Sequence, residues 1–285
     1  MKTIHSLRDL RAELATARND AKTVGFVPTM GALHEGHLSL VRRAKKECGI
    51  AAVSIFVNPL QFGPGEDFAR YPRRPEEDAG LLASAGADLL YAPRSDGFFP
   101  PGFSTAVEVS GVTEGGEGAI RPGHFRGVAT ILARLFLQVA PDAAYFGRKD
   151  LQQVAVVRRM VRDLEFPIRI VACETVREPD GLAMSSRNAY LTAEERARAP
   201  ALSRALFAAR DRAAAGERET GALERETRLA LDAAGLSVDY VEAVGAETME
   251  RAARVAPGVA LTAGVRLGKT RLIDNVLLEA ERTPP

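Results

Sequence analysis

The sequence predicts an α/β fold in which a doubly wound parallel sheet is followed by a smaller α+β domain. Over the first 175 residues, short runs that are apolar throughout alternate with helix-like segments. Strands of a parallel sheet covered on both faces have this pattern. The composition changes after about residue 176, and 285 residues exceed the usual size of a single core. We therefore expect a Rossmann-like domain over residues 1–175 and a smaller C-terminal lid domain over residues 176–285.

The expected elements of the first domain follow from its apolar runs. Strands are predicted at 23–27, 50–57, 88–92, 143–146 and 168–172, with helices starting near 38 and covering 75–85, 127–139 and 151–164. In the second domain, residues 192–215 and 217–234 are rich in Ala, Arg and Glu and predict two helices separated by Gly216. Thr192 and Glu195 have the spacing of a capping box. Strands at 238–244, 259–263 and 271–278 predict an antiparallel sheet.

Composition and charge exclude several classes of function. The formal net charge is +1, which gives no cationic field for nucleic acid or a membrane surface. No apolar run approaches the length of a membrane span, and the N-terminal residues become charged too soon for a signal peptide. The two cysteines, Cys48 and Cys173, form no C-x-x-C pair. We expect a cytoplasmic protein without nucleic-acid or membrane partners.

The most informative segment is Pro28-Thr-Met-Gly-Ala-Leu-His-Glu-Gly-His-Leu-Ser-Leu40, which follows the first predicted strand and opens a helix. Backbone N–H groups at a helix start favour anions. His34 and His37 add hydrogen-bond donors there, and in a parallel sheet ligands bind at the carboxyl ends of strands. A single histidine in such a loop is more often part of a buried turn. Two at this spacing, flanked by Gly31 and Gly36, indicate a nucleotide site.

Polar residues also gather in other predicted loops. Asn58 and Gln61 follow the second predicted strand, where they suit a small polar ligand, although turn formation explains Asn-Pro equally well. Segment 121–127 precedes a helix. Its Arg and His side chains could bind an anion, but its glycines are explained equally well by a loop that enters a helix. Lys149 is placed like a phosphate-contacting lysine at a helix start, and Asp150 suits either ribose hydroxyls or a first helical turn.

Met184-Ser-Ser-Arg187 offers two hydroxyls and a guanidinium, which together suit a phosphate. Paired with His-x-Gly-His, it resembles the two-part signature of the nucleotidyltransferase superfamily, which includes the class I aminoacyl-tRNA synthetases. In that superfamily the second motif usually reads Lys-Met-Ser-Lys-Ser. The chain has no Walker motif and no Gly-x-Gly-x-x-Gly after a strand.

Longer motifs resemble one family closely, that of pantothenate synthetase (pantoate–β-alanine ligase). The resemblance runs from about Val24 to Leu191 and resumes at Arg271-Leu-Ile-Asp-Asn275. Its motifs are Val-Pro-Thr-Met-Gly-Ala-Leu-His-Glu-Gly-His, Ser-Ile-Phe-Val-Asn-Pro-Leu-Gln-Phe, Arg-Pro-Gly-His-Phe-Arg-Gly, Phe-Gly-Arg-Lys-Asp and Asp-Gly-Leu-Ala-Met-Ser-Ser-Arg-Asn. It implies ATP-dependent joining of (R)-pantoate and β-alanine to give pantothenate, AMP and pyrophosphate through an enzyme-bound pantoyl-adenylate. It also implies Mg²⁺ with ATP, and a homodimer.

The resemblance also implies roles for individual residues. His37 is the expected catalytic histidine, with His34 and Lys149 beside it, Gln61 contacts pantoate and β-alanine, and Gln153 contacts pantoate. Arg148 stands where the family commonly has Glu or Gln. The metal ligands stay unknown: Glu77 and Asp78 are possible acidic neighbours, but nothing in their spacing makes them ligands. ATP is expected to contact Met30, Gly31, Ala32, Leu33, His34, Glu35, Gly36, His37, Gly147, Arg148, Lys149, Asp150, Val176, Met184, Ser185, Ser186 and Arg187.

Three other functions account for part of this pattern. Another adenylyl- or cytidylyltransferase would share the histidines and the Ser-Ser-Arg segment, but would leave the matches at Asn58–Phe62 and Gln153 unexplained. An aminoacyl-tRNA synthetase is disfavoured by the near-neutral charge. A nucleotide-binding protein without catalysis would have lost His37, Lys149 or the Ser-Ser-Arg segment, and all are present.

Overall fold

The computed structural model describes residues 1–278, apart from the side chains of residues 95 and 96. The chain forms two compact units. Unit 1 comprises residues 1–109, 122–148 and 156–174, and unit 2 comprises the rest of the chain. Two short segments that precede residue 175, 110–121 and 149–155, thus belong to unit 2. The division of the chain into domains at residues 175 and 176 stays a prediction.

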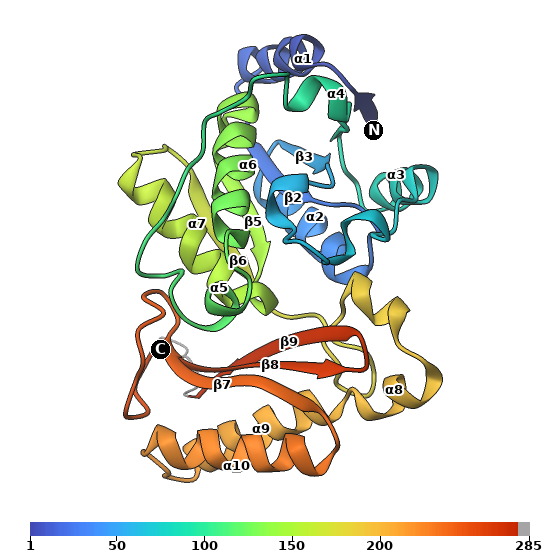
Figure 1. The fold of residues 1–285 in the computed structure, drawn as a ribbon. Helices are drawn as coiled ribbons and strands as arrows, with labels where there is room; N and C mark the ends of the chain where they lie inside the picture. Colours follow the sequence, from blue (N-terminus) through green and yellow to red (C-terminus); the bar gives the residue numbers. More distant parts are fainter. Residues whose placement is uncertain (279–285) are drawn as a thin grey trace. The chain divides into compact units, whose positions relative to one another are not determined.

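Unit 1 contains a six-stranded parallel sheet in the order β1-β4-β3-β2-β5-β6. Figure 1 labels four of its strands, β2, β3, β5 and β6. The chain runs outward from β2 through β3 to β4 and then returns to β5 on the other side of β2. The order therefore reverses between β2 and β5, which is the switch point where doubly wound sheets bind ligands. The strands are β1 (Lys2–Ile4), β2 (Val24–Thr29), β3 (Ile50–Ile55), β4 (Leu89–Tyr91), β5 (Ala143–Gly147) and β6 (Arg169–Cys173).

Helices cover both faces of this sheet because successive side chains of β2 point to opposite sides. Val27 packs into a core cluster with Leu38 and Val41 of α2. Phe26 faces the other way and meets Phe136 of α6 edge-on, with ring centroids 6.5 Å apart. The helices with residues in unit 1 are α1 (Leu7–Asn19), α2 (Glu35–Glu47), α3 (Pro75–Ser84), α4 (Ser95–Phe98), α6 (His124–Val139) and α7 (Leu151–Asp163).

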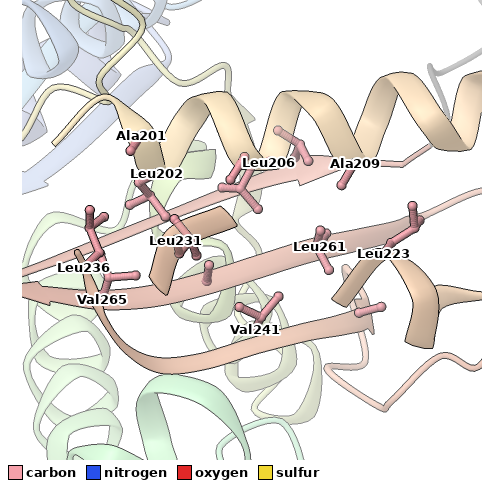
Figure 2. Close-up of a cluster of buried hydrophobic side chains, with 14 of the residues drawn as sticks. Ala201, Leu202, Leu206, Ala209, Leu223, Leu231, Leu236, Val241, Leu261 and Val265 are labelled. Atoms are coloured by element: carbon pink, nitrogen blue, oxygen red, sulfur yellow. The ribbon is translucent and has the colours of Figure 1, made fainter. Parts of the chain in front are cut away.

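Unit 2 is built on the antiparallel sheet β7-β8-β9, formed by Ser237–Gly245, Val259–Leu267 and Thr270–Leu277. Helices α9 (Ala201–Ala214) and α10 (Thr220–Ala233) pack on this sheet. Figure 2 shows the core between them, in which leucines of both helices meet apolar residues of the strands. The predicted fold class is therefore confirmed: a doubly wound parallel sheet and a smaller unit with an antiparallel sheet.

The prediction of one helix over 192–215 was wrong. The structure has α8 (Ala193–Arg198) and α9 as separate helices, and Pro200 lies between them. Proline has no N–H to donate to the carbonyl four residues earlier, so it interrupts the helical ladder. The predicted capping box is confirmed: Thr192 Oγ1 accepts the N–H of Glu195 at 3.2 Å, and Glu195 Oε2 accepts that of Thr192 at 2.9 Å.

Several elements were not predicted, and some boundaries differ: α2 begins at Glu35 and not near residue 38, and β3 ends at Ile55 and not at residue 57. Strand β1 is too short to show a pattern, and α1 was missed although Ser6 caps it. Helix α6 begins at His124, not Gly127, because the left-handed Gly123 lets the chain turn directly into the helix. The remaining short elements are α5 (Gly116–Ile120) and the 3₁₀ turns η1 (Pro59–Gln61), η2 (Asp67–Ala69), η3 (Arg148–Asp150) and η4 (Ser186–Tyr190). None of the helices within residues 1–278 has both the length and the apolar character needed to cross a membrane.

Candidate active site

The loop between β2 and α2 leaves the sheet at its switch point. Gly31 has φ +83°, a conformation that glycine adopts without strain. A Cβ at this position would lie 2.9 Å from Asp78 Oδ2 and 3.1 Å from Ile55 Cγ2. The next residue, Ala32, also has a positive φ of 51°. The loop therefore needs glycine at residue 31, and it holds an alanine in a costly conformation that its surroundings must stabilise.

Asp78 supplies that stabilisation. It lies in the first turn of α3 and is 1% exposed. Its Oδ2 accepts the N–H of Ala32 at 2.9 Å, and its Oδ1 accepts the N–H of Leu33 at 2.8 Å. A buried carboxylate requires such donors because it has lost its hydration. The loop that precedes the histidines is thus fastened to α3 by two charge-assisted hydrogen bonds.

His34 and His37 form a capping box at the start of α2. The Nδ1 atom of His34 accepts the N–H of Gly36 at 3.2 Å. The Nδ1 atom of His37 accepts the N–H of His34 at 3.4 Å. The two rings lie with centroids 4.1 Å apart and their planes tilted by 46°. The two imidazoles thus accept backbone N–H groups in the way that Ser and Glu side chains do in the common capping box.

This capping arrangement assigns the tautomer of both rings. A ring nitrogen that accepts a hydrogen bond carries no proton, so in the neutral imidazole the other nitrogen carries it. Both Nε2 atoms are therefore N–H donors, and both rings are held in orientation by the helix backbone. The pair can follow charge that develops on a phosphate without first reorganising, which is the requirement for electrostatic catalysis.

Gln61 is held beside this loop by Asn58 and Met30. Asn58 is 1% exposed, and its Nδ2 donates to Gln61 Oε1 at 3.0 Å and to the carbonyl of Gly127 at 3.1 Å. Gln61 Nε2 donates to Met30 Sδ at 3.0 Å. The amide of Gln61 is thus oriented, with its oxygen toward Asn58. Two of the residues expected to bind substrates, Met30 and Gln61, are brought into contact.

Gly147 and Arg148 follow at the carboxyl end of β5, the strand beside β2. The Arg148 guanidinium pairs with Glu174, with Nη1 and Oε1 2.8 Å apart. Glu174 is 79% exposed, so the pair is worth little to stability. It does offset the positive charge that Arg148 brings to the carboxyl end of β5.

In unit 2, Lys149 and Asp150 form a contact of 3.4 Å between Nζ and Oδ1, and the Lys149 side chain is 19% exposed. The two glutamines that follow differ in role. Gln152 is buried and its amide is committed to structure: Oε1 accepts the N–H of Glu117 at 2.9 Å, and Nε2 donates to backbone carbonyls of Val112 and Gly115. Gln153 is half-buried and is the expected pantoate contact.

Val176 and Met184 lie at the two open ends of a tight hairpin. The N–H of Met184 donates to the carbonyl of Val176 at 3.0 Å, and Arg177 and Ala183 form a bridge just inside. Ser185 then caps the turn η4, its Oγ accepting the N–H of Arg187 at 3.3 Å. Val176, which is expected to contact ATP, and the Ser-Ser-Arg segment thus belong to one local structure.

The structure distributes the predicted site residues over both units. Unit 1 holds residues 30–37, Gln61, Gly147 and Arg148, and unit 2 holds Lys149, Asp150, Gln153, Val176 and residues 184–187. Sequence reasoning missed the part played by Asp78. An acidic residue in the first turn of a helix is explained by the helix dipole alone, and nothing local indicates that Asp78 is buried or bonded to a loop 46 positions away.

Fold and site together define a doubly wound α/β protein with a loop that bears two histidines at its switch point. The chain belongs to the pantoate–β-alanine ligase family, whose model matches residues 2–277. The expected family and the expected ligase class are therefore confirmed.

Relatives and solved structures cover almost the whole chain. The pantothenate synthetase of Chloroflexus aurantiacus is 52% identical over 283 residues, 99% of each chain, and that of Moorella thermoacetica is 50% identical over 280 residues, 98% of this chain and 99% of the relative. The crystal structure of the Thermus thermophilus pantothenate synthetase has a TM-score of 0.93 at 50% identity, covering 98% of this chain and 100% of that one. A Francisella tularensis pantoate–β-alanine ligase, complexed with β-γ ATP and β-alanine, has a TM-score of 0.81 at 30% identity over 99% of both chains.

Proposed function

We propose that this chain joins (R)-pantoate to β-alanine at the expense of ATP, giving pantothenate, AMP and pyrophosphate through an enzyme-bound pantoyl-adenylate. The observation that carries the proposal is the pair of histidines whose Nδ1 atoms accept backbone N–H groups at the start of α2, which holds both rings in a fixed orientation. Family membership supports the choice of pantoate and β-alanine. The relative crystallised with β-γ ATP and β-alanine supports ATP and β-alanine as substrates.

In the first proposed step, a carboxylate oxygen of pantoate attacks the α-phosphorus of ATP. The new P–O bond replaces the bond to the β-phosphate, and pyrophosphate leaves. Because the attacking carboxylate is already ionised, this step needs no base and no covalent enzyme nucleophile. It needs donors for the charge on the phosphates. His34, His37, Lys149 and the Ser185–Arg187 segment are the side chains suited to that role.

In the second proposed step, the neutral amine of β-alanine attacks the acyl carbon of the adenylate. A C–N bond forms, the bond from the acyl carbon to the phosphate oxygen breaks, and AMP leaves while the amine loses a proton. Gln61, whose amide is oriented by Asn58, is proposed to contact both pantoate and β-alanine. Holding the two reactants together supplies much of the rate acceleration through proximity.

We propose that Mg²⁺ enters as the companion of ATP. Within residues 1–278, no three His, Cys, Asp or Glu side chains gather in a way that could hold a metal ion. Asp78, an acidic residue close to the histidine loop, has both carboxylate oxygens engaged by backbone N–H groups. We therefore propose that the phosphates of ATP supply most of the magnesium ligands, which is the usual arrangement for magnesium and ATP. When bound, Mg²⁺ would neutralise phosphate charge. We further propose that the chain acts as a homodimer, which sedimentation measurements test.

The experiment that tests the function follows pyrophosphate and AMP after ATP and pantoate are mixed with the enzyme, with and without β-alanine. We expect one pyrophosphate per active site without β-alanine, and AMP and pantothenate only after β-alanine is added. ATP binding without pyrophosphate release would contradict the proposal and indicate a different acceptor or a non-catalytic nucleotide-binding protein. Release of AMP and pyrophosphate only when all three substrates are present would contradict the adenylate route.

A further inference from the structure

Strand β9 carries the motif Arg271-Leu-Ile-Asp-Asn275, for which the proposed reaction supplies no role. Leu272 and Val276 belong to the core that α9 and α10 cover. Asp274 lies between them in the alternation of the strand and therefore points to the helix-covered face, whereas Asn275 points to the opposite face. Both side chains are almost fully buried, at 2% and 5% exposure. Both reach segments that carry candidate site residues.

Asp274 holds the hairpin that leads into the Ser-Ser-Arg segment. Arg177 Nη1 donates to Asp274 Oδ2 at 2.6 Å, and Arg177 Nη2 donates to Asp274 Oδ1 at 3.0 Å. The same guanidinium donates to the carbonyl of Gly181 at the hairpin tip and lies 4.8 Å from the ring centroid of Phe207. Such a bidentate pair fixes both distance and direction. The hairpin is therefore held at its base, one residue from Val176.

Asn275 holds the Lys149 segment. Its Nδ2 donates to the backbone carbonyl of Lys149 at 2.9 Å. On the same face of β9, the Arg271 guanidinium forms a bidentate pair with Glu117, whose N–H in turn donates to Gln152 Oε1. Arg271 thus fastens α5 and the first turn of α7 to the strand. Lys149 and Asp150 lie just before α7, and Gln153 lies in its first turn. This part of the chain is therefore bound to β9 at two points, through Asn275 and through Arg271.

We propose that Asp274 and Asn275 are positioning residues that place Lys149 and the Met184–Arg187 segment in one common frame. Two consecutive residues of one strand hold the two phosphate-binding segments of unit 2, so the separation of those segments is set by the strand itself. An error of about 1 Å in such placement can cost on the order of 100-fold in rate. The inference rests on the proposed function because it assigns these segments to the triphosphate.

The first test compares Asn275→Ala with Thr262→Val. Thr262 is the registered neighbour of Asn275 on β8 and is also buried, but its hydroxyl donates to the carbonyl of Glu242 on β7 and reaches no site segment. We expect Asn275→Ala to slow adenylate formation by about 10-fold or more and to raise the KM for ATP. Thr262→Val should change both by less than about 2-fold at a comparable loss of thermal stability. Equal kinetics for the two variants would overturn the role of Asn275.

The second test addresses Asp274, where removing one partner would leave a buried charge and endanger folding. The double variant Arg177→Met with Asp274→Leu removes both charges at once and keeps an apolar contact with Phe207. We expect it to fold and to show adenylate formation slowed by about 10-fold or more, because the hairpin loses its bidentate clamp. A folded double variant with the wild-type rate would overturn the role of Asp274.

A binding measurement separates failure of this inference from failure of the proposed function. ATP binding to each variant is measured by calorimetry without pantoate. We expect Asn275→Ala and the double variant to weaken ATP binding by about 5-fold or more, and Thr262→Val to leave it unchanged. If the wild type binds ATP but releases no pyrophosphate with pantoate, the proposed function fails while these affinities still decide the inference. Equal ATP affinities in the wild type and all variants would overturn the positioning role of Asp274 and Asn275.

Discussion

His37 accepts the backbone N–H of His34 through Nδ1, so the two histidines of the loop are locked to one another through the first turn of α2. The two nitrogens of each imidazole ring therefore have different functions. One ring nitrogen satisfies an N–H group that a helix start would leave without a partner, and the other is an oriented donor. Stability and catalysis at these positions can therefore be separated by substitution.

Replacing His37 with glutamine keeps the capping function, because Gln at this position of a capping box accepts the same N–H. We expect His37→Gln to change the free energy of unfolding by less than about 0.5 kcal/mol and to slow adenylate formation by about 100-fold or more. His37→Ala should be similarly slow and about 1 kcal/mol less stable. Thermal unfolding and pyrophosphate release measure the two effects. A slow His37→Gln enzyme that is also strongly destabilised would mean that the ring is mainly structural.

Replacing Asp78 with asparagine removes one of the two acceptors that hold Ala32 and Leu33. The amide would place an NH₂ group against a backbone N–H in a buried site. We expect a loss of about 1–3 kcal/mol of stability and a raised KM for ATP, since the histidine loop loses its anchor. Glu77→Gln is the control, because Glu77 is exposed on the same helical turn and pairs only weakly with Arg74. Equal effects from both variants would show that the negative charge of α3, and not the two hydrogen bonds of Asp78, determines stability and the KM for ATP.

Replacing Gly127 with alanine tests the packing of α6 against the turn that bears Gln61. A Cβ there would lie 2.1 Å from the carbonyl oxygen of Leu60 and 2.6 Å from the N of Gln61, so backbone must move. We expect a loss of about 1–3 kcal/mol and a raised KM for pantoate. In contrast, a Cβ at Gly80 in α3 meets nothing within 4 Å, so Gly80→Ala should stabilise the protein by up to about 1 kcal/mol. A Gly127→Ala enzyme with unchanged stability and pantoate KM would contradict this interpretation.

Asp239 predicts a specific acid dependence. Burial by itself raises the pKa of this carboxyl group, but hydrogen bonds from Arg271 and Arg266 outweigh burial and hold the pKa below its usual value. An aspartate in the unfolded chain has a pKa of about 3.9, so the unfolded state binds more protons as the pH falls toward that value. The stability that Asp239 contributes is thus complete above about pH 5 and is lost below about pH 4 as the pH passes through the lowered pKa.

Asp239→Asn should therefore be less stable than the wild type at pH 7, and the difference should shrink as the pH falls below about 4. Unfolding by denaturant at a series of pH values measures it. Asp211→Asn is the control, since the Asp211 side chain is 68% exposed and pairs with its neighbour Arg210. A constant difference between wild type and Asp239→Asn at every pH would contradict the prediction.

The sequence predicted most elements because their signals are local. Apolar runs located β2 and β3, and the Thr192–Glu195 spacing located the start of α8. Where local signals conflict or are short, prediction failed. The Ala- and Arg-rich stretch around Pro200 favours a helix so strongly that the break at Pro200 was not predicted. Strand β1 has three residues and is defined by its pairing with β4, which no local pattern indicates. The roles of individual site residues beyond the family assignment stay proposals.

The class of fold, the family and the residue types available to bind a nucleotide could all be inferred from the amino-acid sequence. These depend on periodicity and on motifs that occupy contiguous stretches of chain, such as the one that contains His34 and His37. Three contacts are seen only in the folded molecule: Asp78 fastens the histidine loop, Leu60 excludes a side chain at Gly127, and Asn275 holds the carbonyl of Lys149. Each of these contacts joins residues 45 or more positions apart. Such contacts form only when distant segments pack together, and no local pattern of residues records which partner a buried polar group will meet.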